Sequence, residues 1–119
     1  MKSLKQRTKE FALRIIRLSS SLPNSLEAQV LRKQILRSGT SVGAHYREGS
    51  RARSDAEFVS KLNGGLQELE ETGYWLELLA ESGLVKPERL DDLMNETNEL
   101  TAILVTCIKN AKDRQKSEE

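Results

Sequence analysis

Apolar side chains recur at spacings of three and four residues along most of the chain, which is the period of an amphipathic α-helix. In the first stripe, Leu4, Phe11, Ile15, Leu18 and Leu22 share one helical face. Comparable stripes follow it along the sequence. Together they predict four helices, over residues 4–21, 25–48, 55–82 and 87–112.

Residues that cap helices stand at the ends of these stripes. A side-chain acceptor followed three residues later by Glu or Gln satisfies free amides at a helix start. Three such pairs occur: Ser3 with Gln6, Asn24 with Glu27, and Ser54 with Glu57. Gly49 and Gly83 stand where the second and third helices are predicted to stop, and Pro87 suits the first turn of the fourth. The charged residues 112–119 are expected to fray.

The second predicted helix has one weak stretch. Residues 38–41 read Ser-Gly-Thr-Ser, and each of these lowers helix propensity. A kink or break at this stretch is therefore one alternative. In the other, Gly39 and Gly43 stand four residues apart on one face and allow close packing of a neighbouring helix.

Four amphipathic helices joined by short connections predict an all-α, antiparallel up-and-down four-helix bundle. The 119 residues suit a single domain over 1–119, and the aromatic content of 4% with two prolines argues against an all-β fold. The first apolar stretch is interrupted by Arg14 and Arg17, so it does not resemble a signal peptide. We therefore expect a cytoplasmic protein that does not associate with membranes.

The composition offers little for catalysis or metal binding. One histidine, His45, and one cysteine, Cys107, cannot build a tetrahedral zinc site or an internal disulfide. Composition leaves a Ser-His-Asp set open, yet the chain has no Gly-x-Ser-x-Gly motif. Cys107 lies on an apolar stripe and is expected to be a small buried hydrophobe. We predict no catalytic residues, no metal, no cofactor and no enzymatic activity.

Charge is divided unequally along the chain. Residues 1–53 hold twelve Lys and Arg against three acids, whereas residues 54–119 hold seven against fifteen. This division suits a surface that binds a polyanion, or two opposite surfaces that meet when copies of the chain associate. The remaining alternative is that basic helices lie beside acidic helices and form ion pairs within one chain.

An apolar face on the third predicted helix is wider than one core needs. Tyr74 and Trp75 are adjacent and therefore lie about 100° apart around a helix. With Leu78 they predict an interface with another copy of the chain, and an entirely internal core is the alternative.

Several motifs resemble a known family. They are RSGTSVGAHYRE at 37–48, RARS at 51–54, AEF at 56–58, KL at 61–62 and EETGYWLE at 70–77. Over about residues 11–111 the chain is similar to the bacterial four-helix-bundle proteins called 23S rRNA intervening sequence proteins. Two departures from the family pattern are His45, where Asn is usual, and glycines within the third helix, at Gly64, Gly65 and Gly73.

The resemblance implies more about assembly than about chemistry. The family is named for the position of its genes, and the role of most members is unsettled. Its relatives include the accessory variability protein of diversity-generating retroelements, a basic pentameric ring that works with a reverse transcriptase and nucleic acid. The resemblance thus implies a homopentamer with nucleic-acid-binding capacity and a nucleic-acid-processing protein as a further partner.

Together these observations favour a non-enzymatic, ring-forming homo-oligomer that binds RNA or DNA mainly through phosphates. Six basic residues lie within a 22-residue stretch that holds Glu48 as its one acid. The predicted phosphate-binding residues are these six: Arg32, Lys33, Arg37, Arg47, Arg51 and Arg53. The alternative is a protein scaffold or adaptor in which the charge division serves self-assembly.

Overall fold

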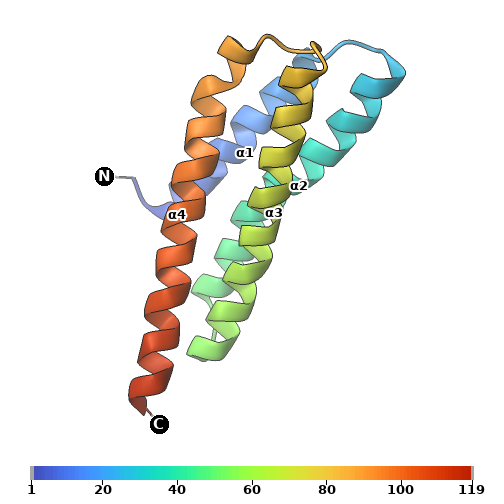
Figure 1. The fold of residues 1–119 in the computed structure, drawn as a ribbon. Coiled ribbons are helices and arrows are strands. Elements are labelled where there is room, and N and C mark those ends of the chain that lie inside the picture. The colour runs from blue at the N-terminus through green and yellow to red at the C-terminus, as the bar shows by residue number, and fades with distance from the viewer. Residues whose placement is uncertain (1, 119) are drawn as a thin grey trace.

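The computed structural model describes residues 2–118 and contains four α-helices within them (Figure 1). Consecutive helices run in opposite directions and are joined by short connections. No strand occurs in this part of the chain, so the all-α prediction is confirmed. The helices are α1 (Leu4–Ser21), α2 (Leu26–Ser50), α3 (Asp55–Glu81) and α4 (Pro87–Glu118).

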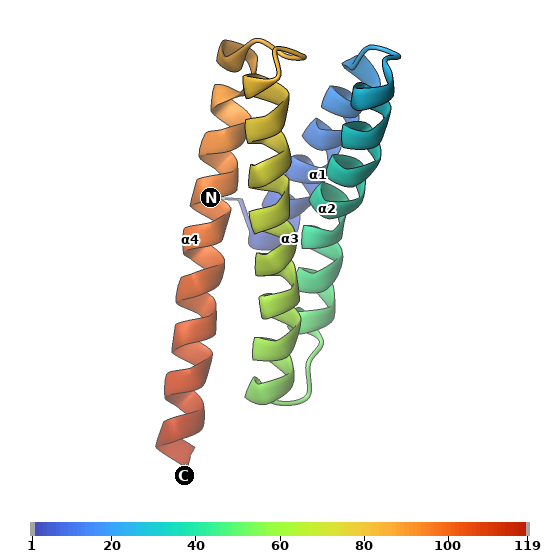
Figure 2. The ribbon, with the colours of Figure 1, turned by 45° about the vertical axis from the view of Figure 1, so that its right-hand side comes forward.

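The helices form an elongated bundle of 54 × 23 × 21 Å. Helix α2 packs extensively against α1 and α3, and α3 packs against α4, whereas α1 and α4 touch only sparingly. Helix α1 is also the shortest, and its first turn lies near the middle of α4 in both views (Figures 1 and 2). The upper half is therefore a four-helix bundle, and the lower end consists of α2, α3 and α4.

The predicted apolar stripes converge on one continuous core along the bundle axis. All four helices contribute fully buried side chains to it, such as Phe11, Ile35, Leu69 and Leu100. Cys107 is half-buried and packs against this core. None of the helices in residues 2–118 is apolar over enough of its length to cross a membrane.

Two of the three predicted caps occur where the sequence places them. The hydroxyl oxygens of Ser3 and Ser54 accept hydrogen bonds from the Gln6 and Glu57 amides, at 3.1 Å each. The third prediction is wrong by one residue, because Ser25 rather than Asn24 caps α2 and accepts from the Ala28 amide at 3.2 Å. A serine oxygen adjacent to the predicted cap supplies the same interaction.

The two predicted glycine stops behave differently. Gly83 has a φ of 81° and follows the end of α3, as a helix-terminating glycine does. Gly49 lies buried inside α2, where a Cβ atom would come within 2.5 Å of Leu62 Cδ1. Its prediction as a stop is wrong, because its function is to let α3 approach.

Helix α2 continues without a break through residues 38–41. The hydroxyls of Thr40 and Ser41 donate to the carbonyl oxygens four residues earlier, at 2.7 and 2.6 Å, which keeps them within the helix. Ser38 shares a buried 2.8 Å hydrogen bond with Thr72 of α3. The polar residues that weaken helix propensity are therefore bound locally or used for packing.

The glycines of this stretch lie against α1. A Cβ at Gly39 would stand 2.7 Å from Ile15 Cγ1, and one at Gly43 would stand 3.2 Å from Thr8 Oγ1. Both distances are shorter than ordinary contacts between such atoms. The backbones of α1 and α2 therefore approach as closely as they do because neither position carries a side chain.

The last helix is longer than predicted. It continues to Glu118, beyond the predicted end at residue 112 and through the segment expected to fray. The Arg114 guanidinium lies 3.0 Å from the Asp55 carboxylate at the start of α3. This contact holds the tail of α4 beside α3, and charged side chains on an exposed turn are compatible with a helix.

Candidate nucleic-acid interface

Helix α2 presents a line of cations on the side opposite its buried residues. At 100° per residue, four basic positions fall within a sector of about 80°. Its buried positions, which include Ile35, Val42 and Gly49, lie on the other side of the helix. The line measures about 27 Å from residue 33 to residue 51. We call it the basic stripe, and it consists of Lys33, Arg37, Arg47 and Arg51.

All four side chains of the basic stripe are exposed. None of them lies within 4.0 Å of a carboxylate belonging to the described residues. The nearest acid in the sequence, Glu48, is paired with Lys61 of α3 at 3.0 Å, and this hydrogen bond lowers the pKa of Glu48. The acid within the predicted binding segment therefore has its own cation and does not neutralise the stripe.

Arg32 has a different environment from the other five predicted residues. Its guanidinium donates to three carbonyl oxygens at the end of α1, those of Ser19 at 3.0 Å, Leu22 at 2.7 Å and Pro23 at 3.0 Å. Carbonyls at a helix C-terminus lack partners within the helix, and a cation suits the negative end of the helix dipole. Arg32 thus joins α2 to the end of α1 through its Nε and Nη2 donors.

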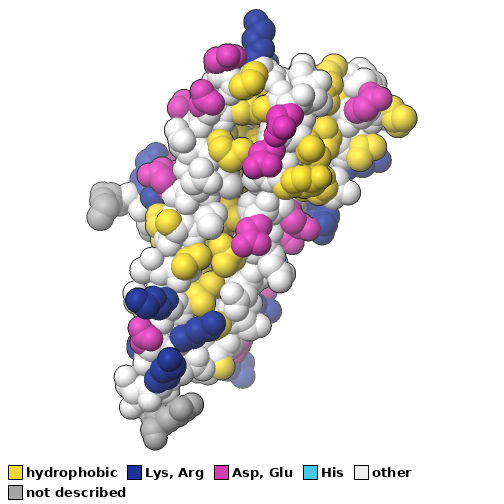
Figure 3. All heavy atoms as spheres, viewed as in Figure 1, with side chains coloured by type: hydrophobic (Ala, Val, Ile, Leu, Met, Phe, Trp, Pro, Cys, Tyr) yellow, Lys and Arg dark blue, Asp and Glu magenta, His cyan; other side chains and the backbone are white. Residues whose placement is uncertain are grey.

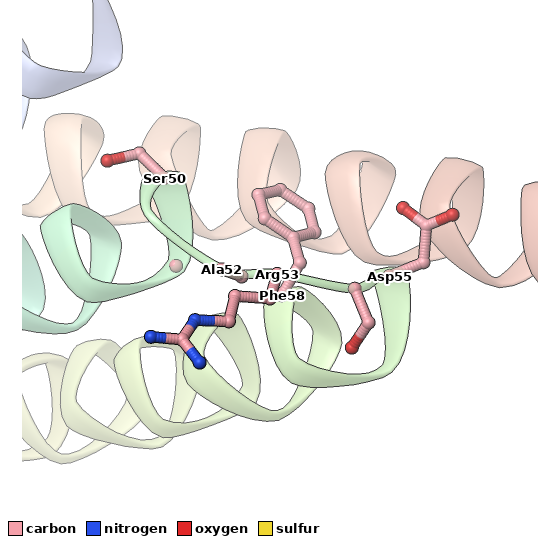
Figure 4. A pocket seen from close by; sticks show the side chains of 7 residues that line it. Ser50, Ala52, Arg53, Asp55 and Phe58 are labelled. Carbon is pink, nitrogen blue, oxygen red and sulfur yellow. The ribbon is translucent and has the colours of Figure 1, made fainter.

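Arg53 lies in the connection between α2 and α3, beside two hollows. The first, of about 560 Å³, is lined by Ser50, Ala52, Arg53, Asp55 and Phe58 among others. Figure 4 shows the Arg53 guanidinium and the Asp55 carboxylate pointing away from each other. The second, of about 490 Å³, is lined by Glu48, Arg51, Arg53, Glu57 and Lys61. Arg51 and Arg53 therefore converge where the stripe ends.

Sequence reasoning missed a second group of cations at this end of the bundle. These residues belong to the tail of α4, and the Arg114–Asp55 ion pair places them beside the start of α3. Figure 3 shows Lys and Arg side chains gathered at the lower end. Antiparallel topology with a longer fourth helix would have indicated this placement. The group consists of Lys109, Lys112, Arg114 and Lys116.

Few of the basic residues in the first half are neutralised by the acidic half. In the described part of the chain, Arg7 alone among the Lys and Arg of residues 1–53 forms an ion pair with a later helix. Its guanidinium lies 2.6 Å from Glu96 and 3.6 Å from Glu99. Internal ion pairing thus accounts for little of the charge division, which leaves most basic side chains free for external contacts.

Acidic side chains gather on α3 and on the first half of α4. Residues 68–99 hold ten acids against Lys86 and Arg89. Figure 3 shows Asp and Glu side chains interspersed with apolar ones over the upper part of the α3–α4 face. A polyanion would therefore be repelled from this face and attracted to α2.

Of the three residues predicted to form an interface, Tyr74 and Leu78 line different grooves, and the rings of Tyr74 and Trp75 lie with their centroids 5.1 Å apart. Tyr74, 53% exposed, lines a groove between α3 and α4. Trp75 is half-buried and packs against the core. Leu78 lines an apolar groove of about 640 Å³ between α2 and α3, whose other apolar members are Leu26, Val30, Leu31 and Leu84. Leu26 and Val30, 73% and 53% exposed, lie outside the core that their spacing predicts for them.

His45 is used in packing between α2 and α3. Its ring fills the space left by Gly64, where a Cβ would lie 2.7 Å from the imidazole Nδ1. This Nδ1 and Glu68 Oε2 are buried without a hydrogen-bond partner among the described residues. Burial raises the pKa of Glu68, with a further contribution from Glu71. The described residues contain no His, Cys, Asp and Glu group suited to a metal ion.

Comparison with known proteins agrees with this architecture. Residues 3–106 match the family model described as 23S rRNA-intervening sequence protein. A crystal structure from Bacteroides thetaiotaomicron, described as a protein with unknown function from the S23 ribosomal protein family, is 43% identical. It aligns with a TM-score of 0.85 over 90% of this chain and 99% of that chain. A comparison with curated proteins found no significant match. Because the family match covers most of the sequence, the chain belongs to the 23S rRNA-intervening sequence protein family.

Proposed function

We propose that this protein is a non-enzymatic, homo-oligomeric nucleic-acid-binding protein whose basic stripe contacts phosphates. The observation that carries the proposal is that Lys33, Arg37 and Arg47 are exposed on one unbroken helix and Arg51 is exposed at its C-cap, with no carboxylate of the described residues within 4.0 Å. Arg53 extends the stripe into the α2–α3 connection. Arg32 is not included, because its donors bind α1.

The shape of the stripe suits a phosphate backbone better than base recognition. A straight line of about 27 Å matches roughly eight phosphates along one strand at 3.4 Å each. The small residues Thr40 and Ala44 lie between its cations, and they offer neither stacking surfaces nor the amide forks that read bases. Binding is therefore expected to depend strongly on salt and weakly on sequence.

Fluorescence anisotropy with labelled RNA and DNA oligonucleotides over a salt series tests this proposal. The variant Arg47→Ala/Arg51→Ala should bind more weakly, and the slope of log affinity against log salt should fall by about 1.4 to 1.8. As single-charge controls, Arg51→Ala should reduce the slope while Lys86→Ala, in the acidic half, should not. Absence of wild-type binding to either nucleic acid at low salt would refute the proposal.

The apolar groove between α2 and α3 supports the oligomeric part of the proposal. Leu26, Val30 and Leu78 present an apolar surface flanked by Glu27 and Glu81, and exposed apolar surface of this kind is typical of interaction sites. We propose that a homopentamer, the assembly that the resemblance to the retroelement accessory protein implies, forms through this groove and presents basic stripes to a nucleic-acid-processing partner. Light scattering of the wild type and of Leu26→Ser tests this assembly.

The same groove favours a second candidate function. A protein that assembles through Leu26, Val30 and Leu78 without binding nucleic acid would be a scaffold or adaptor for another protein. The two measurements separate the candidates. Assembly together with salt-dependent binding supports the first function, whereas assembly without binding at low salt supports the scaffold.

A further inference from the structure

A basic pocket lies between the end of α1 and the beginning of α4, away from the basic stripe. Its cavity measures about 290 Å³. Three leucines form the apolar part of its lining, and three arginines from two helices form the charged part. The lining residues are Arg14, Arg17, Leu18, Ser21, Arg89, Leu90 and Leu93.

The three arginines of this pocket have no anionic partner in the described structure. No carboxylate of residues 2–118 forms an ion pair with Arg14, Arg17 or Arg89. The acids in the first turns of α4, at 88, 91 and 92, are absent from the pocket lining. Three positive charges around one small cavity repel one another, and a bound anion would remove this repulsion.

Arg7 provides a comparison within the same α1–α4 seam. Arg7 lies earlier in α1 than the pocket arginines, and its guanidinium is bound by Glu96 and Glu99 of α4. The hydrogen bond with Glu96 raises the pKa of Arg7. At that level the chain supplies its own carboxylates. At the level of the pocket it supplies leucines instead, which leaves the arginines free for an anion from outside.

We propose that this pocket binds a phosphate group carrying two or more negative charges. Planar guanidinium groups bind phosphate oxygens in paired hydrogen bonds, and three of them match a multiply charged anion better than a single carboxylate. Leu90 and Leu93 in the lining are buried, whereas Arg17 and Arg89 are exposed and accessible to a ligand. The start of α4 adds the positive end of its helix dipole near Arg89.

The volume of the pocket and the hydrogen bond of Ser21 restrict the size of the ligand and the side chains that bind it. A volume of about 290 Å³ is at the lower end of the range of about 300–1,000 Å³ typical of small-molecule sites, so the pocket suits one or two phosphates. Ser21 donates its hydroxyl to the Leu18 carbonyl at 2.7 Å, so the arginines provide the side-chain donors. The phosphate could belong to a free oligophosphate or to the 5′ end of a nucleic acid.

Isothermal titration of the purified protein with inorganic pyrophosphate at low salt tests the pocket itself. The wild type should bind one pyrophosphate per chain, and Arg17→Ala should weaken this binding about tenfold or more. Arg17→Lys, which keeps the charge and loses the planar fork, should retain part of it. Lys5→Ala, an exposed cation of α1 outside both the pocket and the basic stripe, should leave pyrophosphate affinity unchanged, and thermal melts should show that all variants are folded.

A second arm distinguishes the two sources of phosphate. Preference for a 5′-phosphorylated oligonucleotide over its 5′-hydroxyl form, lost in Arg17→Ala, would assign the pocket to nucleic-acid ends. Equal binding of both forms together with pyrophosphate binding would assign it to a free oligophosphate. The proposal is wrong if the wild type does not bind pyrophosphate, or if Arg17→Ala and Lys5→Ala weaken pyrophosphate binding equally. It is also overturned if Arg17→Ala changes only the oligomeric state, since the pocket would then be a contact between copies.

Discussion

Replacing Gly39 by alanine provides a direct test of the close approach between α1 and α2. The new Cβ would lie 2.7, 2.9 and 3.1 Å from Cγ1, Cγ2 and Cβ of Ile15. Comfortable contact between carbon atoms is about 3.5–4.0 Å, so the two helices must separate by roughly 1 Å at this point. Ile15 is fully buried and cannot move its side chain into solvent.

The expected change in stability is the difference between two effects. Overpacking of this kind costs about 1–3 kcal/mol, whereas alanine is favoured over glycine within a helix by about 1 kcal/mol. Gly39→Ala should therefore lower the free energy of unfolding by about 1 kcal/mol and the melting temperature by about 4 °C. In an Ile15→Ala background both Cγ atoms are gone, and the same substitution should stabilise by up to about 1 kcal/mol.

Chemical denaturation of the four proteins in this cycle measures the coupling between the two positions. Gly73→Ala is the matched control, because its Cβ would meet only Thr97 Cγ2 at an ordinary 3.7 Å. It should stabilise the protein by about 1 kcal/mol through helix propensity. If Gly39→Ala and Gly73→Ala raise stability equally, or if Gly39→Ala has the same effect in both backgrounds, the close-approach reasoning is refuted.

Three further predictions concern polar groups. Arg32→Ala should destabilise the protein by about 1.5–3 kcal/mol in denaturation experiments, because three carbonyls at and just after the end of α1 lose a charged donor. The slope of log affinity for nucleic acid against log salt should stay unchanged, and a reduced slope without destabilisation would contradict this prediction. Ser38→Ala should cost about 1 kcal/mol, and Ser38→Ala/Thr72→Val should cost little more, because the double variant leaves no unpaired partner; additive losses would argue against the shared hydrogen bond. Burial raises the pKa of Glu68, so its stabilising contribution is complete below the ordinary value of 4.5 and is lost as pH rises through the raised folded value. Glu68→Gln should therefore gain stability relative to the wild type between about pH 4.5 and 7 in a denaturation series, and a constant difference across this range would contradict the shift.

Periodicity in the sequence was sufficient to predict four helices and their order, because a helix must bury one face wherever the bundle forms. It was less informative about helix ends. Asn24 and Ser25 both offer capping oxygens, and the choice between them depends on how the chain turns after α1. Residues 112–118 continue α4 although they carry no apolar stripe, and the contact of Arg114 with Asp55, more than fifty residues away, is one that no local pattern reveals.

The candidate site was predictable only in part, for a related reason. Helical geometry alone places Lys33, Arg37 and Arg51 on one side of a helix, but it does not show that the helix is unbroken. In the sequence Arg32 is one of several neighbouring cations. Its role in binding the carbonyls at the end of α1 depends on the packing of α1 beside α2, which the sequence does not reveal. The arginine pocket at the α1–α4 seam requires tertiary structure, since Arg17 and Arg89 are far apart in the chain.

His45 and Gly64 depend on each other in packing. The structure places one directly against the other, with the ring occupying the volume that a side chain at Gly64 would need. The resemblance marks both positions as departures from the family pattern, and this contact gives the two of them one physical explanation, because a large residue at 45 requires a small one at 64.

The shortness of α1 has a consequence for the order in which the protein opens. Helix α1 does not extend beyond about the middle of the bundle, so the lower end is formed by α2, α3 and α4 alone. Several side chains that pack there are only partly buried, among them Tyr46, Phe58 and Cys107. Fewer buried contacts mean a lower free energy of local opening. Backbone amides around Val59 and Ile108 should exchange with deuterium before those around Leu69 and Leu100. We therefore expect the lower end to open locally while the four-helix half stays closed.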